Sequence, residues 1–279
     1  MLRVSQREEA SKLSVIEEAF TKAREKGEGA LITYICAGDP TPKDTIKYIH
    51  ALVKGGCDLI EIGLPFSDPI AEGPTIQGSI DRALNAGMNP DLYFDLVKGL
   101  DMDIPLLVMT YYNLIFKRGV DKFVSDCVNS NISGIIVPDL PIEESGDLAK
   151  SCKRHGIDLI YFIAPTTTDS RIKATINEAT GFLYLLARLG VTGARADVPQ
   201  SAEALLTRLK DVKISKAVGF GISRKEHAEA LVRAGADGVI VGSAFVDIIA
   251  ACEDTEDKLT NLVKELKDGC KSGFSQRQK

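Results

Sequence analysis

The sequence predicts an α/β fold, namely a single (β/α)₈ TIM barrel that occupies residues 1–279, with an extra helix at its N-terminus. Short runs rich in Ile, Val and Leu alternate with longer amphipathic stretches along the whole chain, a pattern typical of parallel strands joined by helical crossovers. No linker and no change of composition divides the series. A doubly wound open sheet is the alternative, but it usually has fewer strands and a nucleotide-binding fingerprint, which this sequence lacks.

Eight apolar runs are predicted to be the strands. They lie at Leu31–Cys36, Leu59–Ile62, Leu106–Thr110, Gly134–Val137, Leu159–Ile163, Phe182–Leu186, Ala217–Gly219 and Gly238–Val241. The helices between them are expected to begin near Ser, Thr, Asp or Pro and to end near Gly, as helix capping favours. Examples are Pro42–Lys54, Ile142–His155 and Ser223–Ala234, each followed directly by a glycine.

Both ends of the chain carry segments outside this alternation. The pattern predicts a helix over Lys12–Glu25, before the first strand, that could plug the N-terminal end of the barrel. The stretch after Lys267, about 268–279, is polar and is expected to form a flexible tail. Between these ends, three similar turns join a helix to a strand and indicate a repeated structural unit. They are Gly55–Asp58, Asn131–Gly134 and Ala234–Gly238.

Composition excludes several classes of protein. Hydrophobic residues make up 44% of the chain and the net charge is −5, without a basic cluster, which fits an ordinary globular protein and argues against nucleic-acid binding. Residues Met1–Val15 lack the apolar core of a secretory signal, and no stretch approaches the roughly 18 apolar residues of a membrane span, so a cytoplasmic location is expected. The six scattered cysteines are predicted to be buried thiols. His50, His155 and His227 fall in predicted helices, so no metal site is expected.

The second predicted strand is an apolar run broken by one carboxylate, Glu61. Because side chains alternate along a strand, Leu59 and Glu61 share one face while the two isoleucines face the other way. Glu61 is therefore expected to point into the barrel mouth, at the end where such barrels place their active sites. Loss of hydration there would raise its pKa and let it exchange a proton near neutral pH. The alternative is a Glu at the rim, paired with a Lys or Arg.

The segment after this strand, Leu64–Gln77, contains three prolines and one glycine, which predict an irregular loop that adds Asp68 and Glu72 to the same face. Residues 61–77 resemble the long signature of the tryptophan synthase α-subunit family, Pro-Phe-Ser-Asp-Pro followed by Gly-Pro-Thr-Ile-Gln. A run of this length is highly specific, and the resemblance extends over nearly the whole chain. The other similar segments are Gly38-Asp39-Pro40, Tyr111 and Asn113, Pro138–Pro141, Tyr184, Gly190–Gly193, Gly219–Ser223 and Gly242-Ser243.

This resemblance implies a carbon–carbon lyase that cleaves indole-3-glycerol phosphate into indole and D-glyceraldehyde 3-phosphate by a retro-aldol reaction. Glu61 resembles the catalytic acid and base of the family. The second family carboxylate, which binds the indole N–H, is normally Asp, whereas this chain has Glu72. The extra methylene moves the carboxylate by more than about an ångström unless the loop shifts, and misplacement on that scale can lower a rate roughly a hundredfold. We still expect Glu72 to fill the role, because the residues on both sides match.

The resemblance also implies the residues around the indole ring. Tyr34 stands where the family usually has Phe, and Pro138 where a small residue is common, so both are expected to adjust the indole pocket. The segment Arg188–Pro199 contains two glycines and is expected to close as a lid over the phosphate end. The substrate-binding residues implied by the resemblance are Tyr34, Tyr111, Tyr184 and Thr192.

Independently of the resemblance, the last two strand–helix junctions predict a phosphate site. Gly219 and Gly221 leave room for a ligand against the backbone, and Ser223 is placed to cap the next helix. Helix N-termini offer free N–H groups to an anion, and barrels commonly bind phosphate at these two junctions. Tight turns with helix caps are the alternative interpretation, and a dinucleotide fingerprint is absent because residue 224 is Arg. The resemblance implies that Gly193, Gly221 and Ser243 line this site, and the full set of phosphate-binding residues predicted is Gly193, Gly221, Ile222, Gly242 and Ser243.

The resemblance further implies a partner, a pyridoxal-phosphate β subunit that receives indole within an α2β2 heterotetramer for the last step of L-tryptophan biosynthesis. Pro65, Asp68 and Asn113 are expected at that interface. No metal and no organic cofactor is expected in this chain, since pyridoxal phosphate would lie only in the β subunit.

Three other functions are alternatives to the lyase at the level of the sequence. Another phosphate-binding barrel, such as an isomerase or synthase of the same pathway, would require a strand-end Lys or a Cys–Asp pair, which cannot be placed here, and Glu61 with its loop fits such an enzyme poorly. A metal-dependent epimerase would need inward-facing His residues, and none is predicted. A non-catalytic barrel that only binds and activates the β subunit is consistent with Glu72 in place of Asp. Indole release by the isolated chain distinguishes this last function from the lyase.

Overall fold

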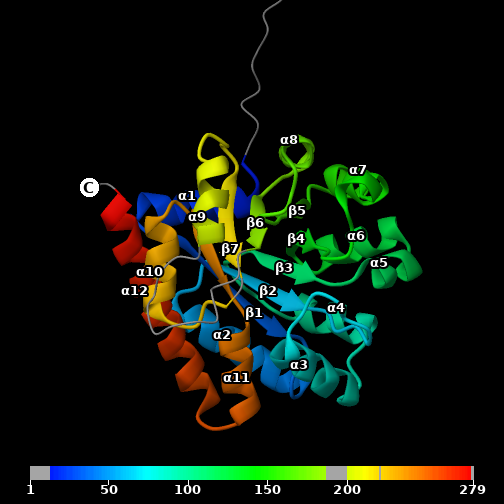
Figure 1. The fold of residues 1–279 in the computed structure, drawn as a ribbon. Coiled ribbons are helices and arrows are strands. Elements are labelled where there is room, and N and C mark those ends of the chain that lie inside the picture. The colour runs from blue at the N-terminus through cyan, green and yellow to red at the C-terminus, as the bar shows by residue number, and fades with distance from the viewer. Residues whose placement is uncertain (1–12, 187–199, 220, 278–279) are drawn as a thin grey trace, which may run out of the picture.

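Eight parallel strands form a closed barrel in the computed structural model of the chain, which describes residues 13–186, 200–219 and 221–277. Strands that are neighbours in the sequence are neighbours in the barrel, and the last strand pairs with the first (Figure 1). The strands are β1 (Ala30–Cys36), β2 (Leu59–Gly63), β3 (Leu106–Met109), β4 (Ile132–Ile136), β5 (Asp158–Ile163), β6 (Phe182–Leu186), β7 (Ser215–Gly219) and β8 (Gly238–Val241). The predicted (β/α)₈ barrel is confirmed, and the open sheet is excluded.

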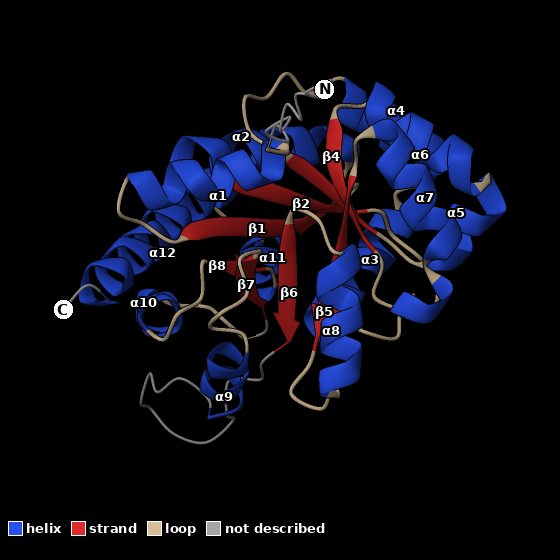
Figure 2. Ribbon diagram, turned by 90° about the horizontal axis from the view of Figure 1, so that it is seen from above, coloured by secondary structure: helices blue, strands red, loops and turns tan. Residues whose placement is uncertain are grey.

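Helices surround the strands, as the view from above shows (Figure 2). They are α1 (Val15–Glu25), α2 (Pro42–Gly55), α3 (Pro74–Asn85), α4 (Pro90–Lys98), α5 (Tyr112–Arg118), α6 (Val120–Asn129), the 3₁₀ helix η1 (Ile142–Glu144), α7 (Gly146–His155), α8 (Asp169–Glu178), α9 (Gln200–Arg208), α10 (Lys225–Arg233), α11 (Ser243–Ala251) and α12 (Thr255–Arg277). The predicted helix over Ile142–His155 is divided, because Ser145 ends the 3₁₀ turn before α7 begins. Within the described ranges, no helix is long and apolar enough to cross a membrane.

Alternation along the strands separates the apolar residues into an inner and an outer layer. On β2, Leu59 joins the cluster inside the barrel, whereas Ile60 and Ile62 belong to the cluster between strands and helices. Glu61 therefore lies on the inner face, as predicted. The inner cluster also contains Ile32, Leu107, Ile136, Ile160, Ala217 and Ile240. These side chains fill the middle of the barrel, so space for a ligand lies at the mouth above them.

Helix α1 closes the N-terminal end of the barrel, as expected. A capping box fixes its start, because the Glu17 N–H donates to Ser14 Oγ (3.2 Å) and the Ser14 N–H donates to Glu17 Oε2 (2.8 Å). Its apolar face, which includes Ile16 and Phe20, packs into the inner cluster. There the Phe20 ring lies against Phe182, with ring centroids 5.4 Å apart.

The C-terminal segment contradicts the predicted flexible tail. Residues 268–277 are the last turns of α12, and Cys270 is fully buried. Helix α12 runs beside α10 (Figure 1), and a Cβ at Gly273 would lie 2.3 Å from the Glu229 carbonyl oxygen. The prediction was wrong because polar residues and glycines suggest a frayed end. Here the polar residues form the outer face of the helix, and Gly269 and Gly273 allow close packing against α10.

Candidate active site

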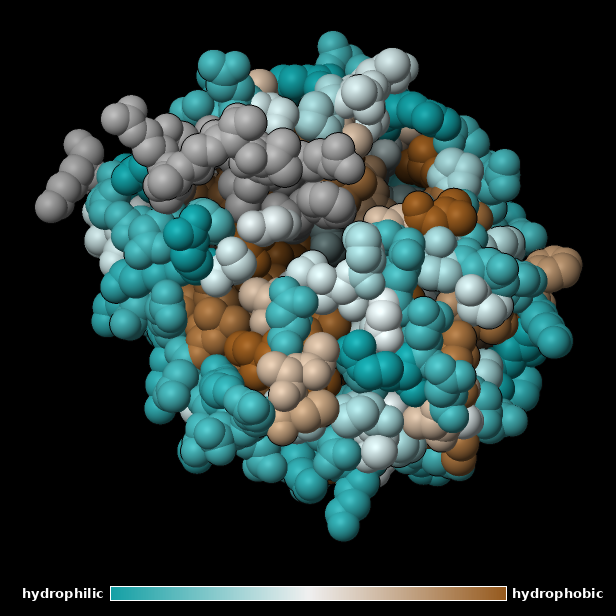
Figure 3. All heavy atoms as spheres, turned by 60° about the horizontal axis from the view of Figure 1, so that its bottom comes forward, coloured by the Kyte–Doolittle hydropathy of each residue, from teal (hydrophilic) through white to brown (hydrophobic). Residues whose placement is uncertain are grey.

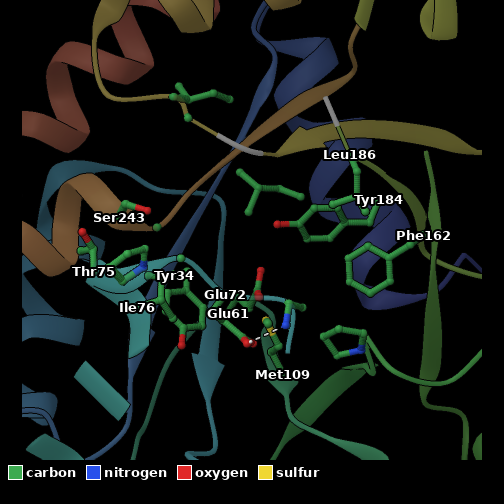
Figure 4. Close-up of a pocket in the computed structure, with 18 of the residues that line it drawn as sticks. Tyr34, Glu61, Glu72, Thr75, Ile76, Met109, Phe162, Tyr184, Leu186 and Ser243 are labelled. Carbon is green, nitrogen blue, oxygen red and sulfur yellow. Dashed lines mark hydrogen bonds between the residues drawn. The ribbon is translucent and has the colours of Figure 1, made fainter. Parts of the chain in front are cut away.

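A cavity of about 700 Å³ opens at the C-terminal ends of the strands. The space-filling view shows apolar residues gathered in a hollow at the front of the molecule (Figure 3). None of the described residues that line the cavity is Lys, Arg or His. The lining residues, most of which Figure 4 draws, are Tyr34, Glu61, Ala71–Ile76, Met109, Pro138, Phe162, Pro165, Tyr184, Leu186, Ser201, Gly221, Ile222, Ile240, Gly242 and Ser243.

Glu61 lies in the wall of this cavity with only 1% of its surface exposed. Its Oε2 atom is buried and has no hydrogen-bond partner among the described residues. Burial and, to a smaller extent, the negative charge of Glu72 raise the pKa of Glu61 to about 8. The described part of the chain offers no Lys or Arg in the cavity wall to pair with it, which argues against a rim ion pair. Such a carboxyl can both give and take a proton near neutral pH.

The loop that carries Glu72 is fastened to Tyr111, the residue directly before α5. The Tyr111 hydroxyl accepts hydrogen bonds from the N–H groups of Ile70 (2.8 Å) and Ala71 (2.9 Å), and it donates to Glu72 Oε2. The Phe66 ring stacks on Tyr111 with ring centroids 5.2 Å apart. Burial and the bond to Glu72 raise the pKa of Tyr111, so its hydroxyl keeps the proton that it donates. The carboxylate of Glu72 is thereby held in one place.

Tyr34 and Tyr184 stand on either side of the two carboxylates (Figure 4). Tyr34 on β1 is in register with Glu61 on β2. Each ring lies over a glycine. A Cβ at Gly63 would lie 2.5 Å from the Tyr34 hydroxyl, and one at Gly219 would lie 2.6 Å from the Tyr184 hydroxyl. Burial raises the pKa of both tyrosines well above its usual value, so both hydroxyls stay protonated and can donate a hydrogen bond.

An apolar wall continues from Tyr184. The Phe162 ring on β5 lies against Tyr184, with ring centroids 4.6 Å apart, and Met109 at the end of β3 also lines the cavity. Aromatic faces and a flexible thioether suit a flat aromatic ligand. Met109 and Phe162 were not among the site residues predicted from the sequence. Strand alternation carries the signal that could have found them, since they follow the inner residues Leu107 and Ile160 by two positions.

Two helix N-termini border another part of the cavity. Helix α11 begins at Ser243 after Gly242, and α10 begins at Lys225 after the turn that contains Gly221 and Ile222. Gly221 has a φ of +78°, in the left-handed region that glycine adopts without strain. Neither helix has a side-chain hydrogen bond at its N-cap. In each first turn the N–H of the third residue, His227 or Phe245, bonds to the N-cap carbonyl, so the N–H groups of the two residues before it are the ones available to an anion.

The predicted cap of α10 is wrong. Arg224, in an extended conformation, is the N-cap residue, and Ser223 lies before the helix. The Ser223 N–H instead donates a hydrogen bond to Nδ1 of His227 (3.3 Å). Capping depends on which residue leaves the helical conformation, and a Ser near a helix start does not determine that.

Comparison with known proteins identifies the family to which the chain belongs. The family model described as "Tryptophan synthase alpha chain" matches residues 20–274. A tryptophan synthase alpha chain from Methanosarcina barkeri is 55% identical over 256 residues, which are 92% of this chain and 97% of the relative. Another from Halobacterium salinarum is 50% identical over 255 residues, covering 88% of this chain and 92% of the relative. The chain belongs to the tryptophan synthase alpha chain family.

Solved structures agree with this assignment. A chain in the aminoacrylate-bound tryptophan synthase from M. tuberculosis is 32% identical with a TM-score of 0.84, covering 92% of this chain and 99% of that one. A chain in the tryptophan synthase complex from Pyrococcus furiosus is 38% identical with a TM-score of 0.79, covering 86% and 98%. The family resemblance drawn from residues 61–77 is thus confirmed.

The structure brings most of the residues expected in the tryptophan synthase alpha chain site together. Those that line the one cavity are Tyr34, Glu61, Glu72, Tyr184, Gly221, Ile222, Gly242 and Ser243. Tyr111 was expected at the substrate, but it lies behind the loop and bonds to Glu72. Thr192, Gly193 and the expected lid Arg188–Pro199 lie outside the described residues.

The residues expected at the partner interface differ in exposure. Asp68 and Asn113 are exposed, but Pro65 is buried at the start of its loop. A side chain that is buried within its own chain offers little surface to a partner, so the structure gives no support to Pro65 as a partner contact. Two apolar side chains that were not predicted, Ile70 and Phe116, are 79% and 70% exposed. Ile70 is in the same loop as Asp68, and Phe116 is on α5 with Asn113.

Among the described residues, no group of His, Cys, Asp and Glu is arranged to hold a metal ion. The prediction of buried thiols is confirmed for five of the six cysteines, and Cys252 is exposed.

Proposed function

We propose that this chain cleaves indole-3-glycerol phosphate into indole and D-glyceraldehyde 3-phosphate, the α reaction of tryptophan synthase. The observation that carries the proposal is Glu61, a buried carboxyl with an unpaired oxygen and a pKa raised to about 8, in the wall of a cavity. The apolar wall of that cavity suits an indole ring, and the helix N-termini suit a phosphate monoester. The site thus offers each part of this substrate a chemically matched surface.

In the proposed reaction, Glu61 moves one proton in each direction. The protonated carboxyl gives a proton to C3 of the indole ring, which places positive charge on the ring nitrogen. The carboxylate then takes the proton from the hydroxyl on the carbon attached to C3. That oxygen forms the aldehyde, the carbon–carbon bond breaks, and its electron pair returns to the ring to give indole. Glu61 ends protonated, as it began, so no other reactant is required and a pKa of about 8 suits both steps.

Glu72 is proposed to stabilise the charge on the ring nitrogen. Its Oε2 atom is held by the Tyr111 hydroxyl and the Ala71 N–H (3.2 Å), whereas the described residues provide no hydrogen bond to Oε1. We propose that Oε1 accepts the indole N–H. Tyr111 is then a positioning residue, which draws the longer Glu side chain back and offsets its extra methylene.

The proposed contacts of the rest of the substrate follow from the cavity wall. The indole ring is placed against Phe162 and Tyr184, with the Tyr34 hydroxyl as a further donor. The phosphate is placed at the first turns of α10 and α11, where Gly221, Ile222, Gly242 and Ser243 line the cavity. Thr192 and Gly193 are proposed to join these ends from the segment outside the described residues. The chemistry uses no metal and no organic cofactor in this chain.

We also propose a tryptophan synthase β subunit as the partner, in an α2β2 heterotetramer. Support comes from Ile70 and Phe116, which have the largest exposed fractions among the large apolar side chains of the described residues and lie on the segments that carry Asp68 and Asn113. Asp68 and Asn113 are proposed as polar contacts beside them. The pyridoxal phosphate of the whole reaction would lie in the β subunit, which would take the indole produced here.

The direct test is steady-state cleavage of indole-3-glycerol phosphate by the purified chain, with and without a cognate β subunit. We expect wild type to release indole and the β subunit to accelerate it. Glu61→Gln is expected to lower kcat on the order of a thousandfold, because it removes the acid and base. Glu72→Asp is expected to stay within about tenfold of wild type, because the shorter side chain loses the Tyr111 bond but keeps the charge.

The same experiment addresses the non-catalytic alternative. If wild type releases no indole even with the β subunit, and Glu72→Asp restores release, the chain is a binding subunit that activates its partner. If Glu61→Gln retains wild-type kcat, Glu61 is not the acid and base, and the proposed mechanism is wrong.

A further inference from the structure

The first turn of α10 contains a histidine that reaches back to the turn before the helix. The Ser223 N–H donates a hydrogen bond to Nδ1 of His227 (3.3 Å). The other ring nitrogen, Nε2, lies 3.4 Å from Nη2 of Arg224. The turn that His227 holds also contains Gly221 and Ile222, which line the cavity. The mechanism proposed above gives His227 no part.

Helix α1 shows what a bond of this kind does. Its third residue, Glu17, accepts the N–H of Ser14 (2.8 Å), the residue at which the helix starts. His227 is likewise the third residue of α10, but it accepts the N–H one position earlier, at Ser223. Because Arg224 makes no side-chain cap bond, the His227 bond fastens the preceding turn to the helix.

The imidazole can make only one of its two neighbouring contacts. A neutral imidazole has a single acceptor nitrogen, and both the Ser223 N–H and the Arg224 guanidinium are donors. When Nδ1 accepts from Ser223, Nε2 carries the hydrogen and cannot bond to Arg224. Partial burial and the charge of Arg224 lower the pKa of His227, while Glu226 raises it by less, so the ring is neutral at neutral pH. It can therefore act as the acceptor.

We propose that His227 is a positioning residue for the phosphate end of the site. By accepting the Ser223 N–H, it holds the turn containing Gly221 and Ile222 at the start of α10, so that the free N–H groups of turn and helix converge on one anion. It does not touch the substrate itself. The inference rests on the proposed function, because it assumes that a phosphate monoester binds at this end of the cavity.

The test uses the chain with its β subunit and compares His227→Ala with His227→Gln. We expect His227→Ala to raise KM for indole-3-glycerol phosphate roughly three- to tenfold, the size of one lost cap bond, with kcat unchanged. The inhibition constant of inorganic phosphate is expected to rise by the same factor, and that of indole to stay constant. His227→Gln is expected to restore both constants, because its side-chain oxygen can accept the same N–H. His50→Ala, at an exposed position on α2, is the matched control and is expected to change neither.

Three results would overturn the inference: unchanged constants in His227→Ala, no restoration by His227→Gln, or a fall in kcat without weaker binding of inorganic phosphate. Thermal unfolding of each variant separates a change in KM from a loss of fold. Failure of the proposed function is visible in wild type instead, where no indole would form or inorganic phosphate would not compete with the substrate.

Discussion

Asp58 and Asp237 at the N-terminal end of the barrel differ from Glu61 at its mouth in whether the carboxylate is paired. At the N-terminal end, Asp58 accepts the Leu31 N–H (2.8 Å) and pairs with Lys267 of α12 (2.8 Å). Asp237 makes the same kinds of bond between two later strands. At the mouth, Glu61 is more deeply buried, yet one of its oxygens has no partner among the described residues. Paired groups at one end stabilise the fold, whereas the unpaired group at the other end is free to react.

The greatest difference between Glu61 and the paired carboxylates is expected in how stability depends on pH. The pKa of Glu61 is about 8 in the folded chain and near 4.5 when unfolded. Because the folded pKa is the higher one, the stabilising contribution is complete below about pH 4.5 and is lost as the pH rises through about 8. We expect the free energy of unfolding of Glu61→Gln, relative to wild type, to grow on the order of 4 kcal/mol from about pH 5 to about pH 9. Denaturant titrations at several pH values measure this difference, and a constant difference would show that the carboxyl is hydrated.

A smaller effect is expected when the paired end is broken. Lys267→Met leaves Asp58 and Glu28 without their common partner, although both carboxylates are largely buried. We expect the free energy of unfolding to fall by roughly 3 kcal/mol, with kcat unchanged in the folded protein. Chemical denaturation and steady-state kinetics check the two parts. Lys258→Met, on the same helix and beside Glu253 in an exposed pair, is the matched control and is expected to change stability by less than about 0.5 kcal/mol. A large loss of kcat in Lys267→Met would show that the pairing at the N-terminal end also affects catalysis at the mouth.

The smallest expected effect concerns the loop at the mouth. Tyr111→Phe removes the donor to Glu72 and the acceptor for two backbone N–H groups. We expect kcat to fall about tenfold, because the Glu72 carboxylate loses its fixed position. Tyr161→Phe, which breaks a buried bond to Ser145 (2.7 Å) away from the cavity, serves as the control and is expected to keep kcat. Equal kcat values in the two variants would show that Tyr111 does not position Glu72 for catalysis.

The predictions from sequence succeeded where a short repeating pattern of apolar and polar residues determines the structure. Strand alternation placed Glu61 on the inner face, and the apolar runs located all eight strands, because both follow from the geometry of an extended backbone in a closed barrel. The same alternation carries Met109 and Phe162 to the cavity. Their position was predictable, although their residue types did not suggest chemistry.

The errors arose where contacts between distant segments decide the outcome. Tyr111 holds a loop 40 positions earlier in the chain, a contact that no spacing in the sequence reveals. The last turns of α12 are ordered by their packing on α10, which overrides the low helix propensity of Gly269 and Gly273. Ser223 is not the cap because the helix starts later, with Arg224 as its N-cap residue.

Helix α1 has a consequence for where products go. Ile16 and Phe20 form a floor under the inner cluster, so the described residues close the barrel below the cavity. A product that forms in a cavity closed at the bottom must leave through the same opening by which the substrate entered. A protein bound over that opening therefore controls whether an apolar product diffuses into water or passes into the bound protein. Covering the opening is therefore enough to direct the product, and the barrel wall needs no second passage.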